Sequence, residues 1–431
     1  MQHRIPVEDL GPYGRAMADA ATACVHCGFC LPSCPTYQVL GEEMDSPRGR
    51  IYLMKGVLEG RLEARAVAEH VDRCLGCLAC ESACPSGVQY HKLLLPYRAA
   101  AGTDTPRSPM ARLKRWLALR TLPYPRRFRL VVHAGRLTRW LRPVTPPALR
   151  PMLDLLPAEL PAAAPIPETI PAAGTRRARV ALLTGCVQQA LDPNINQATI
   201  DVLTRNGVEV VVPRAQGCCG ALAWHIGEGD AARRHARGIL QAFPDDVDAI
   251  IVNAAGCGSG IKEYPLVFAG REEEDAARKL ADRVVDVSVF LDRLGLVPPP
   301  PLPSPLRLAY HDACHLCHAQ GVRAEPRRLL RAIDGLELVE LGDGERCCGS
   351  AGTYNIDQPE IAGQLGRMKA EAVRRTGCDV VATGNIGCMV QIGTHLGDGV
   401  PAVMHTMQVL AMAYAGTLRG HGDAGRSAPG R

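Results

Sequence analysis

Two copies of one cysteine motif constrain this chain more than any other part of its sequence. The first copy begins at Cys24 with the spacing C-x2-C-x2-C-x3-C-P, and the second begins 50 residues later, at Cys74, with the same spacing. Iron–sulfur clusters require soft thiolate ligands. In this spacing three close cysteines bind one cluster, while the fourth crosses to the other. The repeated motif therefore predicts a ferredoxin-type domain with two [4Fe–4S] clusters.

The crossing of the fourth cysteine divides the eight thiolates into two sets. The first cluster is assigned the set Cys24, Cys27, Cys30 and Cys84. The second cluster is assigned the set Cys34, Cys74, Cys77 and Cys80. A pair of zinc knuckles is the alternative, but zinc sites use C-x2-C pairs separated by longer spacers and often include histidine. His26 lies inside the first motif and is interpreted as a neighbour of the cluster rather than a ligand.

The segment between the motifs indicates a larger domain than a bare ferredoxin. The motifs are separated by 39 residues, and apolar residues recur at helical spacing between Pro47 and Arg65. We therefore expect residues 1–104 to form a mostly helical, ferredoxin-like α+β domain that carries both clusters.

The other ten cysteines lie between Cys186 and Cys388, and eight of them form two copies of a second pattern. Each copy contains a single cysteine, then Cys-Cys-Gly, then Gly-Cys, and the equivalent cysteines are 128, 129 and 131 residues apart. A proline-rich run at 298–305 separates the copies. The sequence thus predicts a first cysteine-rich (CCG) repeat at 176–300 and a second at 301–416.

Each repeat alternates apolar strand patterns with helical patterns, and its cysteines follow the strands. This order predicts α/β units with mainly parallel sheets, in which the carboxyl ends of the strands share one edge. Four thiolates would converge at that edge in each repeat. The first candidate CCG site is Cys186, Cys218, Cys219 and Cys257. The second candidate CCG site is Cys314, Cys347, Cys348 and Cys388. The alternative is that these cysteines pack as small apolar side chains.

Five segments carry a resemblance to one known family: VHCGFCLPSCPTY, DSPRGRIYLMKGVLEG, RCLGCLACESACPSGVQY, GCGSGIKEY and CCGSAGTYNI. They resemble the iron–sulfur subunit of bacterial glycolate dehydrogenase (glycolate oxidase), over nearly the whole chain. The resemblance implies that two FAD-binding, flavin-type subunits oxidise glycolate to glyoxylate. It also implies that this chain passes their electrons towards a quinone or another membrane acceptor. The CCG repeats are similar, in addition, to the cysteine-rich domains of heterodisulfide reductases and of an anaerobic glycerol-3-phosphate dehydrogenase subunit.

The repeats depart from the heterodisulfide pattern at their last cysteine. That pattern ends in C-x-x-C and supplies five thiolates, whereas Gly260 and Gln391 stand here where the fifth cysteine would be. Four thiolates suit a [4Fe–4S] cluster or a structural zinc ion instead. Cys317 is interpreted as a spare thiol near the second site, and Cys378 as a structural residue.

The chain lacks the motifs of a substrate-oxidising subunit. No G-x-G-x-x-G opens a βαβ unit and no P-loop is present, so no catalytic residue is predicted on this chain and the hydride chemistry belongs to a partner. Two alternatives stay open. One is the iron–sulfur subunit of another flavin dehydrogenase, for a 2-hydroxy acid such as D-lactate or for glycerol-3-phosphate. The other is a thiol/disulfide redox enzyme. Aromatic residues at 4% and a net charge of +5 give no sign of a nucleic-acid partner.

The predicted connector, residues 105–175, is basic and rich in proline. Between Thr105 and Leu153 it has twelve Lys/Arg and no Asp/Glu, and nine prolines follow between Pro143 and Pro171. Two segments, ARLKRWLALR and FRLVVHAGRLTRWLR, mix arginine with Leu, Val and Trp, as interfacial amphipathic helices do. Three interpretations stay open: contact with a membrane surface, packing on the ferredoxin-type domain, or docking of an acidic flavin subunit.

The distribution of apolar residues predicts where the protein is located in the cell. No stretch approaches 18 apolar residues, and the first residues include no apolar region of a secretory signal. We therefore expect a cytoplasmic protein, with any membrane contact peripheral and at the inner face. Residues 417–431 are small and polar and predict a disordered tail.

Overall fold

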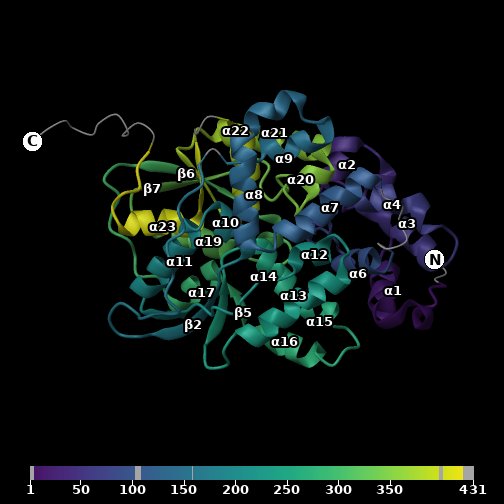
Figure 1. Cartoon of the computed structure of the whole chain (residues 1–431), viewed down its shortest axis with the longest axis horizontal. Coiled ribbons are helices and arrows are strands. Elements are labelled where there is room, and N and C mark those ends of the chain that lie inside the picture. The colour runs from purple at the N-terminus through teal and green to yellow at the C-terminus, as the bar shows by residue number, and fades with distance from the viewer. Residues whose placement is uncertain (1–3, 102–107, 158, 398–400, 421–431) are drawn as a thin grey trace, which may run out of the picture.

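The structure, a computed structural model, describes residues 4–101, 108–157, 159–397 and 401–420. Along the chain these residues form a helical N-terminal domain, a helical connector and two α/β units, which run from purple to yellow in Figure 1. The expected multidomain fold with two mainly parallel sheets is confirmed.

Helices surround the two cysteine motifs in the N-terminal domain. They are η1 (Val7–Tyr13), α1 (Gly14–Thr22), α2 (Pro35–Leu40), η2 (Glu43–Asp45), α3 (Pro47–Leu58), α4 (Ala64–Asp72), α5 (Ala79–Ser82) and α6 (His91–Ala101). Helix α3 begins where the Ser46 hydroxyl accepts a hydrogen bond from the Gly49 N–H at 3.0 Å. Met54 and Leu93 are fully buried between the helices. The described residues of this domain contain no strand, so its regular structure is helical and most motif cysteines lie in loops.

The two repeats build two separate sheets with the same strand order. The strands are β1 (Thr169–Ile170), β2 (Ala178–Leu183), β3 (Val208–Val211), β4 (Ala249–Val252), β5 (Val284–Asp286), β6 (Leu306–His311), β7 (Leu336–Glu340), β8 (Val380–Thr383) and β9 (Ala402–His405). Among the described residues the first sheet has the order β1-β3-β2-β4-β5 and the second β7-β6-β8-β9. All neighbours pair in parallel except β1, which is antiparallel to β3. The order β3-β2-β4-β5 therefore repeats as β7-β6-β8-β9.

Helices connect and cover these strands. In the first repeat they are α10 (Cys186–Leu191), α11 (Asn194–Arg205), α12 (Ala221–His225), α13 (Gly229–Ala242), α14 (Ala255–Lys262), α15 (Tyr264–Val267), α16 (Glu274–Arg283) and α17 (Val287–Leu294). In the second they are α18 (Cys314–Cys317), α19 (Ala324–Arg331), α20 (Tyr354–Asp357), α21 (Pro359–Thr376), α22 (Ile386–Leu396) and α23 (Thr406–Tyr414).

The repeats pack against each other through equivalent helices. Helix α11 of the first repeat packs on α23 of the second, and α17 of the first packs on α19 of the second. Because α11 and α19 follow the first cysteine of each repeat, while α17 and α23 follow the last strand, the same helix pair is used twice. Leu182, Ile251 and Leu308 belong to one continuous core that both sheets share. The duplication thus produces a pseudo-twofold pair.

The single cysteines lie just beyond the strands, at the starts of helices. Cys186 opens α10 three residues after β2 ends, and Cys314 opens α18 in the same relation to β6. The strand that precedes Cys257, β4, stops short of this cysteine. It ends at Val252, and Cys257 lies in the first turn of α14.

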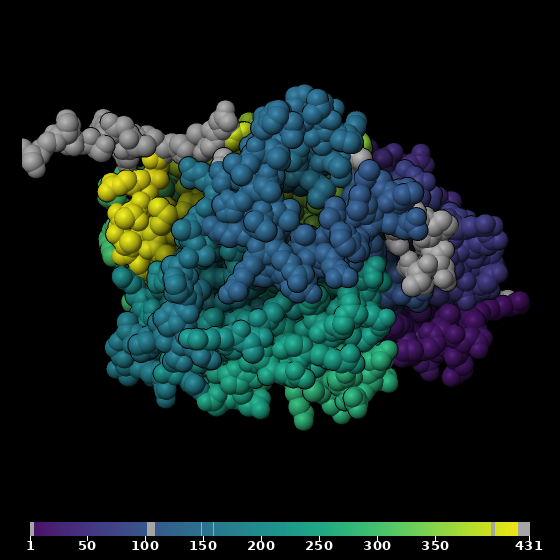
Figure 2. Space-filling model, viewed as in Figure 1, coloured from purple at the N-terminus to yellow at the C-terminus, as the bar shows by residue number. Residues whose placement is uncertain are grey.

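The connector lies against the CCG repeats and not against the ferredoxin-type domain alone. It contains α7 (Pro109–Thr121), α8 (Pro125–Leu137), η3 (Arg139–Val144), η4 (Pro147–Leu149) and α9 (Arg150–Asp154). Helix α8 packs on α10, and Arg115 forms an ion pair with Glu228 at 2.6 Å. Lys114 donates a hydrogen bond to the Ile356 carbonyl of the second repeat at 3.0 Å. The connector therefore bridges both repeats, and its residues cover the upper part of the face in Figure 2.

The C-terminal segment is only partly described. Leu418, within the predicted disordered tail, is 1% exposed and belongs to the shared core, so the ordered chain extends further than expected. Residues 421–431 of that tail lie outside the described residues. None of the described helices has both the length and the apolar character needed to cross a membrane.

The glycine of each Cys-Cys-Gly motif occupies a position that other residues fit poorly. Gly220 and Gly349 have φ of +79° and +94°, in the left-handed region. A Cβ atom on Gly220 would lie 2.8 Å from the Ala232 carbonyl oxygen, and one on Gly349 would lie 2.8 Å from the Ala362 carbonyl oxygen. The turn after each cysteine pair therefore requires glycine in both repeats.

Replacing Gly220 by Ala should lower the free energy of unfolding by roughly 1–3 kcal/mol, because it adds backbone strain and a close contact. Gly217→Ala is the matched control, since its Cβ would have no neighbour within 4 Å. Chemical denaturation of both variants measures the difference. Equal stability of the two variants would contradict the strained turn.

Candidate metal centres

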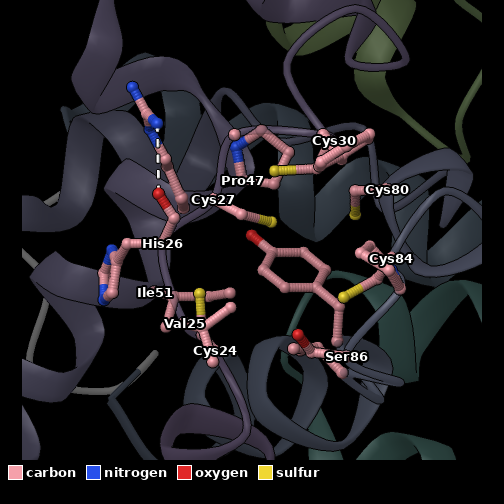
Figure 3. Close-up of a pocket in the computed structure, with 16 residues that line it drawn as sticks. Cys24, Val25, His26, Cys27, Cys30, Pro47, Ile51, Cys80, Cys84 and Ser86 are labelled. Atoms are coloured by element: carbon pink, nitrogen blue, oxygen red, sulfur yellow. Dashed lines mark hydrogen bonds between the residues drawn. The ribbon is translucent and has the colours of Figure 1, made fainter.

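The first cysteine set lines one pocket near the surface of the N-terminal domain. Cys24, Cys27, Cys30 and Cys84 surround it, and Figure 3 shows their sulfur atoms directed towards a common space. Cys27 is exposed, whereas Cys24 is buried. Burial raises the pKa of the Cys30 thiol to about 11, so ionisation there needs a compensating positive charge such as a metal.

The second cysteine set lines a neighbouring, deeper pocket. Cys34, Cys74, Cys77 and Cys80 surround it, together with Arg50 and Tyr90. Cys80 also lines the first pocket, so the two pockets share a wall. The structure thus brings together both sets in the grouping that the crossing of Cys34 and Cys84 predicts.

A buried positive charge faces the second set. Arg50 is 1% exposed, forms an ion pair with Asp45 at 3.1 Å, and lies 3.9 Å from the Cys34 sulfur. The Gly76 N–H and the Tyr90 hydroxyl donate to the Cys74 sulfur at 3.4 and 3.8 Å. A buried guanidinium requires anionic neighbours, and donors that point at sulfur stabilise thiolates bound to a metal. These residues therefore fit a cluster ligated by thiolates.

The first CCG site gathers its thiols at the edge of the first sheet. The sulfur atoms of Cys186 and Cys218 are 3.4 Å apart. The thiols of Cys218 and Cys257 lower the pKa of Cys219 well below its usual value. Tyr264 fixes this loop, because its hydroxyl donates to the Cys219 carbonyl at 2.7 Å. The four predicted cysteines therefore lie close together in space, and the lowered pKa of Cys219 favours its thiolate form.

The second CCG site repeats this arrangement. The sulfur atoms of Cys314 and Cys347 are 3.8 Å apart, and the thiols of Cys347 and Cys388 lower the pKa of Cys348. Asn385 donates to the Cys388 sulfur at 3.5 Å. Soft thiolates in groups of four fit zinc or iron–sulfur clusters, and both sites meet that requirement.

The second cysteine set lies against the second CCG site. Cys77 belongs to the same buried cluster as Cys314 and Cys347, and Tyr354 of the second repeat donates to the Arg73 carbonyl at 2.8 Å. The first repeat also reaches this region. Arg98 donates to the Cys74 carbonyl at 2.7 Å and to the His225 carbonyl at 3.0 Å. The ferredoxin-type domain therefore contacts both repeats beside the second cysteine set.

Two residues at these sites were not found from the sequence. Arg50 lies in the segment DSPRGRIYLMKGVLEG, but its role was not evident because it depends on burial beside Cys34. His311 lies with Cys348 and Cys388, the ligand atoms of all three within 4.8 Å of one another. Comparison of the two repeats could have revealed His311, because the equivalent residue of the first repeat is Leu183.

The remaining cysteines and the motif histidine also have defined positions. Cys317 is fully buried, with His318 and Glu345 near its sulfur. Cys378 lies two residues before β8, at the other end of the strand from the second CCG site. The backbone carbonyl of His26 accepts a hydrogen bond from Arg48 at 3.3 Å.

Known families match the same regions of the chain. Residues 20–88 match the 4Fe-4S dicluster domain, and residues 180–262 and 308–393 match the cysteine-rich domain named CCG. The glycolate oxidase iron-sulfur subunit of Escherichia coli (strain K12) is 38% identical over 94% of this chain and 98% of its own length. The chain belongs to the family of glycolate oxidase iron–sulfur subunits.

Other members and relatives extend this comparison. A probable glycolate oxidase iron-sulfur subunit of Bacillus subtilis (strain 168) is 37% identical over 86% of this chain and 87% of its own length. Lactate utilization protein A of Geobacillus thermodenitrificans (strain NG80-2) is 33% identical over 54% of this chain and 98% of its own length. The family membership, with the dicluster match, confirms the expected [4Fe–4S] centres and an iron–sulfur subunit of an oxidoreductase.

Replacing Cys34 by Ala should remove the second cluster and keep the first, because Cys34 lines only the second pocket. Iron analysis should then show a loss of roughly four iron atoms per chain, and EPR should show one remaining signal of the ferredoxin type. Cys378→Ala is the control, since this buried thiol lies outside all four sets. Selective loss of the first cluster in the Cys34 variant would refute the crossing.

Proposed function

We propose that this chain is the electron-transfer subunit of a flavin-dependent glycolate dehydrogenase, and that it carries electrons from the flavin towards a quinone-type acceptor. Oxidation of glycolate to glyoxylate releases two electrons and two protons, and reduction of a quinone to a quinol consumes the same number. The first and second cysteine sets would hold the two [4Fe–4S] clusters, which pass single electrons. Two FAD-binding subunits would carry the substrate site, and this chain would contribute no catalytic residue.

The observation that carries the proposal is the series formed by the cysteine sets. The first set is open to the surface at Cys27, and its pocket borders that of the second set at Cys80. The second set in turn lies against Cys314 of the second CCG site. An electron can therefore move from the surface to the interior in short steps. A chain that acted as a separate thiol enzyme would not need a surface-to-interior series.

The surface around the first set suits the flavin subunit. Val25 is 62% exposed and Phe29 is 68% exposed, and both flank the exposed Cys27; Tyr52 is 48% exposed. Exposed apolar side chains beside an electron-transfer centre are typical of a protein interface. We place the flavin subunit there, because docking would bring the flavin close to the first cluster.

The experiment that tests the proposal compares the isolated chain with the complex. The complex with its flavin subunits should reduce an artificial dye with glycolate, and the isolated chain should not. Phe29→Asp should weaken assembly of the complex, because it places a charge in the apolar interface, whereas Phe243→Leu, in the core of the first repeat, should leave assembly unchanged. Turnover of D-lactate or glycerol-3-phosphate in place of glycolate would redirect the proposal to another dehydrogenase. Glycolate oxidation by the isolated chain would refute it.

The connector would place the acceptor side of the protein at the membrane. Leu130, Leu137, Trp140 and Val144 are 70–78% exposed, and exposed arginines lie among them. Such a surface inserts apolar side chains at the headgroup boundary while arginine meets anionic lipid. Helix α8 also packs on α10, which begins at Cys186, so this surface lies close to the first CCG site. We propose peripheral contact at the inner face of the cytoplasmic membrane.

The complex should therefore co-sediment with vesicles that contain anionic lipid, and less so at high salt, because each basic residue near such a surface contributes about 1 kcal/mol and is screened. Replacing Arg126, Arg127 and Arg139 by Gln should weaken binding further. Arg234→Gln and Arg278→Gln, in the first repeat, form the control. Equal binding to neutral and anionic vesicles would contradict this assignment of the connector.

A further inference from the structure

A buried histidine beside the second CCG site has no ordinary role in the fold. His311 is the last residue of β6 and is fully buried. Neither of its ring nitrogens has an oxygen or nitrogen partner among the described residues, and the polar group beside the ring is the Cys348 thiol. Buried polar groups without a partner cost stability, and a histidine in that position calls for a specific explanation.

The ring of His311 lies within the thiol group of the site. One of its nitrogens and the sulfur atoms of Cys348 and Cys388 are all within 4.8 Å of one another. The two remaining thiols are close by, since Cys347 directly precedes Cys348 on the chain and the sulfur atoms of Cys314 and Cys347 are 3.8 Å apart. Imidazole nitrogen and thiolate sulfur together form a common ligand set for zinc, and histidine also replaces cysteine in some iron–sulfur clusters.

The first repeat shows that the fold does not require histidine here. The residue equivalent to His311 is Leu183, at the same offset of 128 residues that relates Cys314 to Cys186. Leu183 is the last residue of β2 and is buried in the apolar core. An apolar side chain therefore fits the equivalent position, and the imidazole of the second repeat adds a ligand atom where packing needs none.

We propose that His311 is a metal ligand, so that the second CCG site binds its metal through one imidazole nitrogen, the thiolates of Cys348 and Cys388, and one thiolate from the neighbouring pair Cys314 and Cys347. The first CCG site binds through thiolates alone. The chemistry required is a borderline-soft metal centre, which either a zinc ion or an iron–sulfur cluster supplies. This inference rests on metal binding at the site and not on the direction of electron flow.

The mixed ligand set has a consequence for an iron centre. A neutral imidazole in place of a thiolate removes negative charge from the cluster. Iron–sulfur clusters in which histidine replaces cysteine have higher reduction potentials. The second CCG site also lies next to Cys77 of the second cysteine set. An iron cluster there would therefore accept electrons more readily than one held by thiolates alone. With zinc, the site would instead fix the loop geometry beside the second set.

The test uses the full chain as purified with its metals, and it begins with the wild type. Iron and zinc are counted per chain, and X-ray absorption at the zinc edge and pulsed EPR of reduced iron centres are recorded after labelling with ¹⁵N-histidine. We expect nitrogen in the zinc shell, or a ¹⁵N coupling on one iron centre. Purely sulfur ligation throughout, or a second CCG site without metal, would overturn the proposal. Neither measurement depends on glycolate turnover, so failure of the proposed function is distinguishable.

Variants assign the signal to His311. His311→Leu copies the first repeat and should abolish the nitrogen signal, or lose the metal of one site only. His395→Leu is the control, because its ring in the same repeat is already partnered by the Gln391 carbonyl at 2.9 Å. A nitrogen signal and metal content unchanged in His311→Leu would refute the assignment. Leu183→His should conversely add nitrogen ligation to the first site.

Discussion

Cysteine side chains that converge at four sites join parts of this chain that are far apart in sequence, and the surrounding helices and strands are arranged around these meeting points. Cys84 joins the first motif and Cys34 joins the second, so neither half of the N-terminal domain holds a complete set. In each repeat, parallel strands deliver three separate segments to one sheet edge. Close approach there requires the left-handed glycine after each cysteine pair.

Burial of the thiolates of the second cysteine set is electrostatically unfavourable, and the surrounding residues reduce this cost. Cys77 is buried, and burial together with the nearby Cys314 raises its pKa. The buried guanidinium of Arg50 lies 3.9 Å from the Cys34 sulfur in the same set and is held by Asp45. A metal centre supplies the remaining positive charge, which couples metal binding to folding.

The cysteine sets and the α/β repeats could be predicted from local spacing, because motif lengths and strand patterns are encoded within short segments. Cys186 and Cys314 follow their strands as expected. Other features depend on contacts between distant segments. Arg50 comes close to the Cys34 sulfur only when α3 packs beside it. Arg115 of the connector forms its ion pair with Glu228, which lies far from it in the sequence. The packing of α8 on α10 could not be predicted from the sequence, because a pattern of basic and apolar residues is equally compatible with several kinds of contact surface. His311 was accessible only by comparing the repeats residue by residue.

The central claim is that four separate thiolate sets, two in the N-terminal domain and one in each repeat, bind metals, and that the two N-terminal sets and the second CCG site form a connected series. Anomalous X-ray diffraction from crystals of the purified complex, recorded at the iron and zinc edges, tests it most directly. The account predicts iron at the Cys24 and Cys74 sets, and iron or zinc within reach of Cys218 and of Cys347. Iron at only one N-terminal set, or no metal at either repeat, would contradict it.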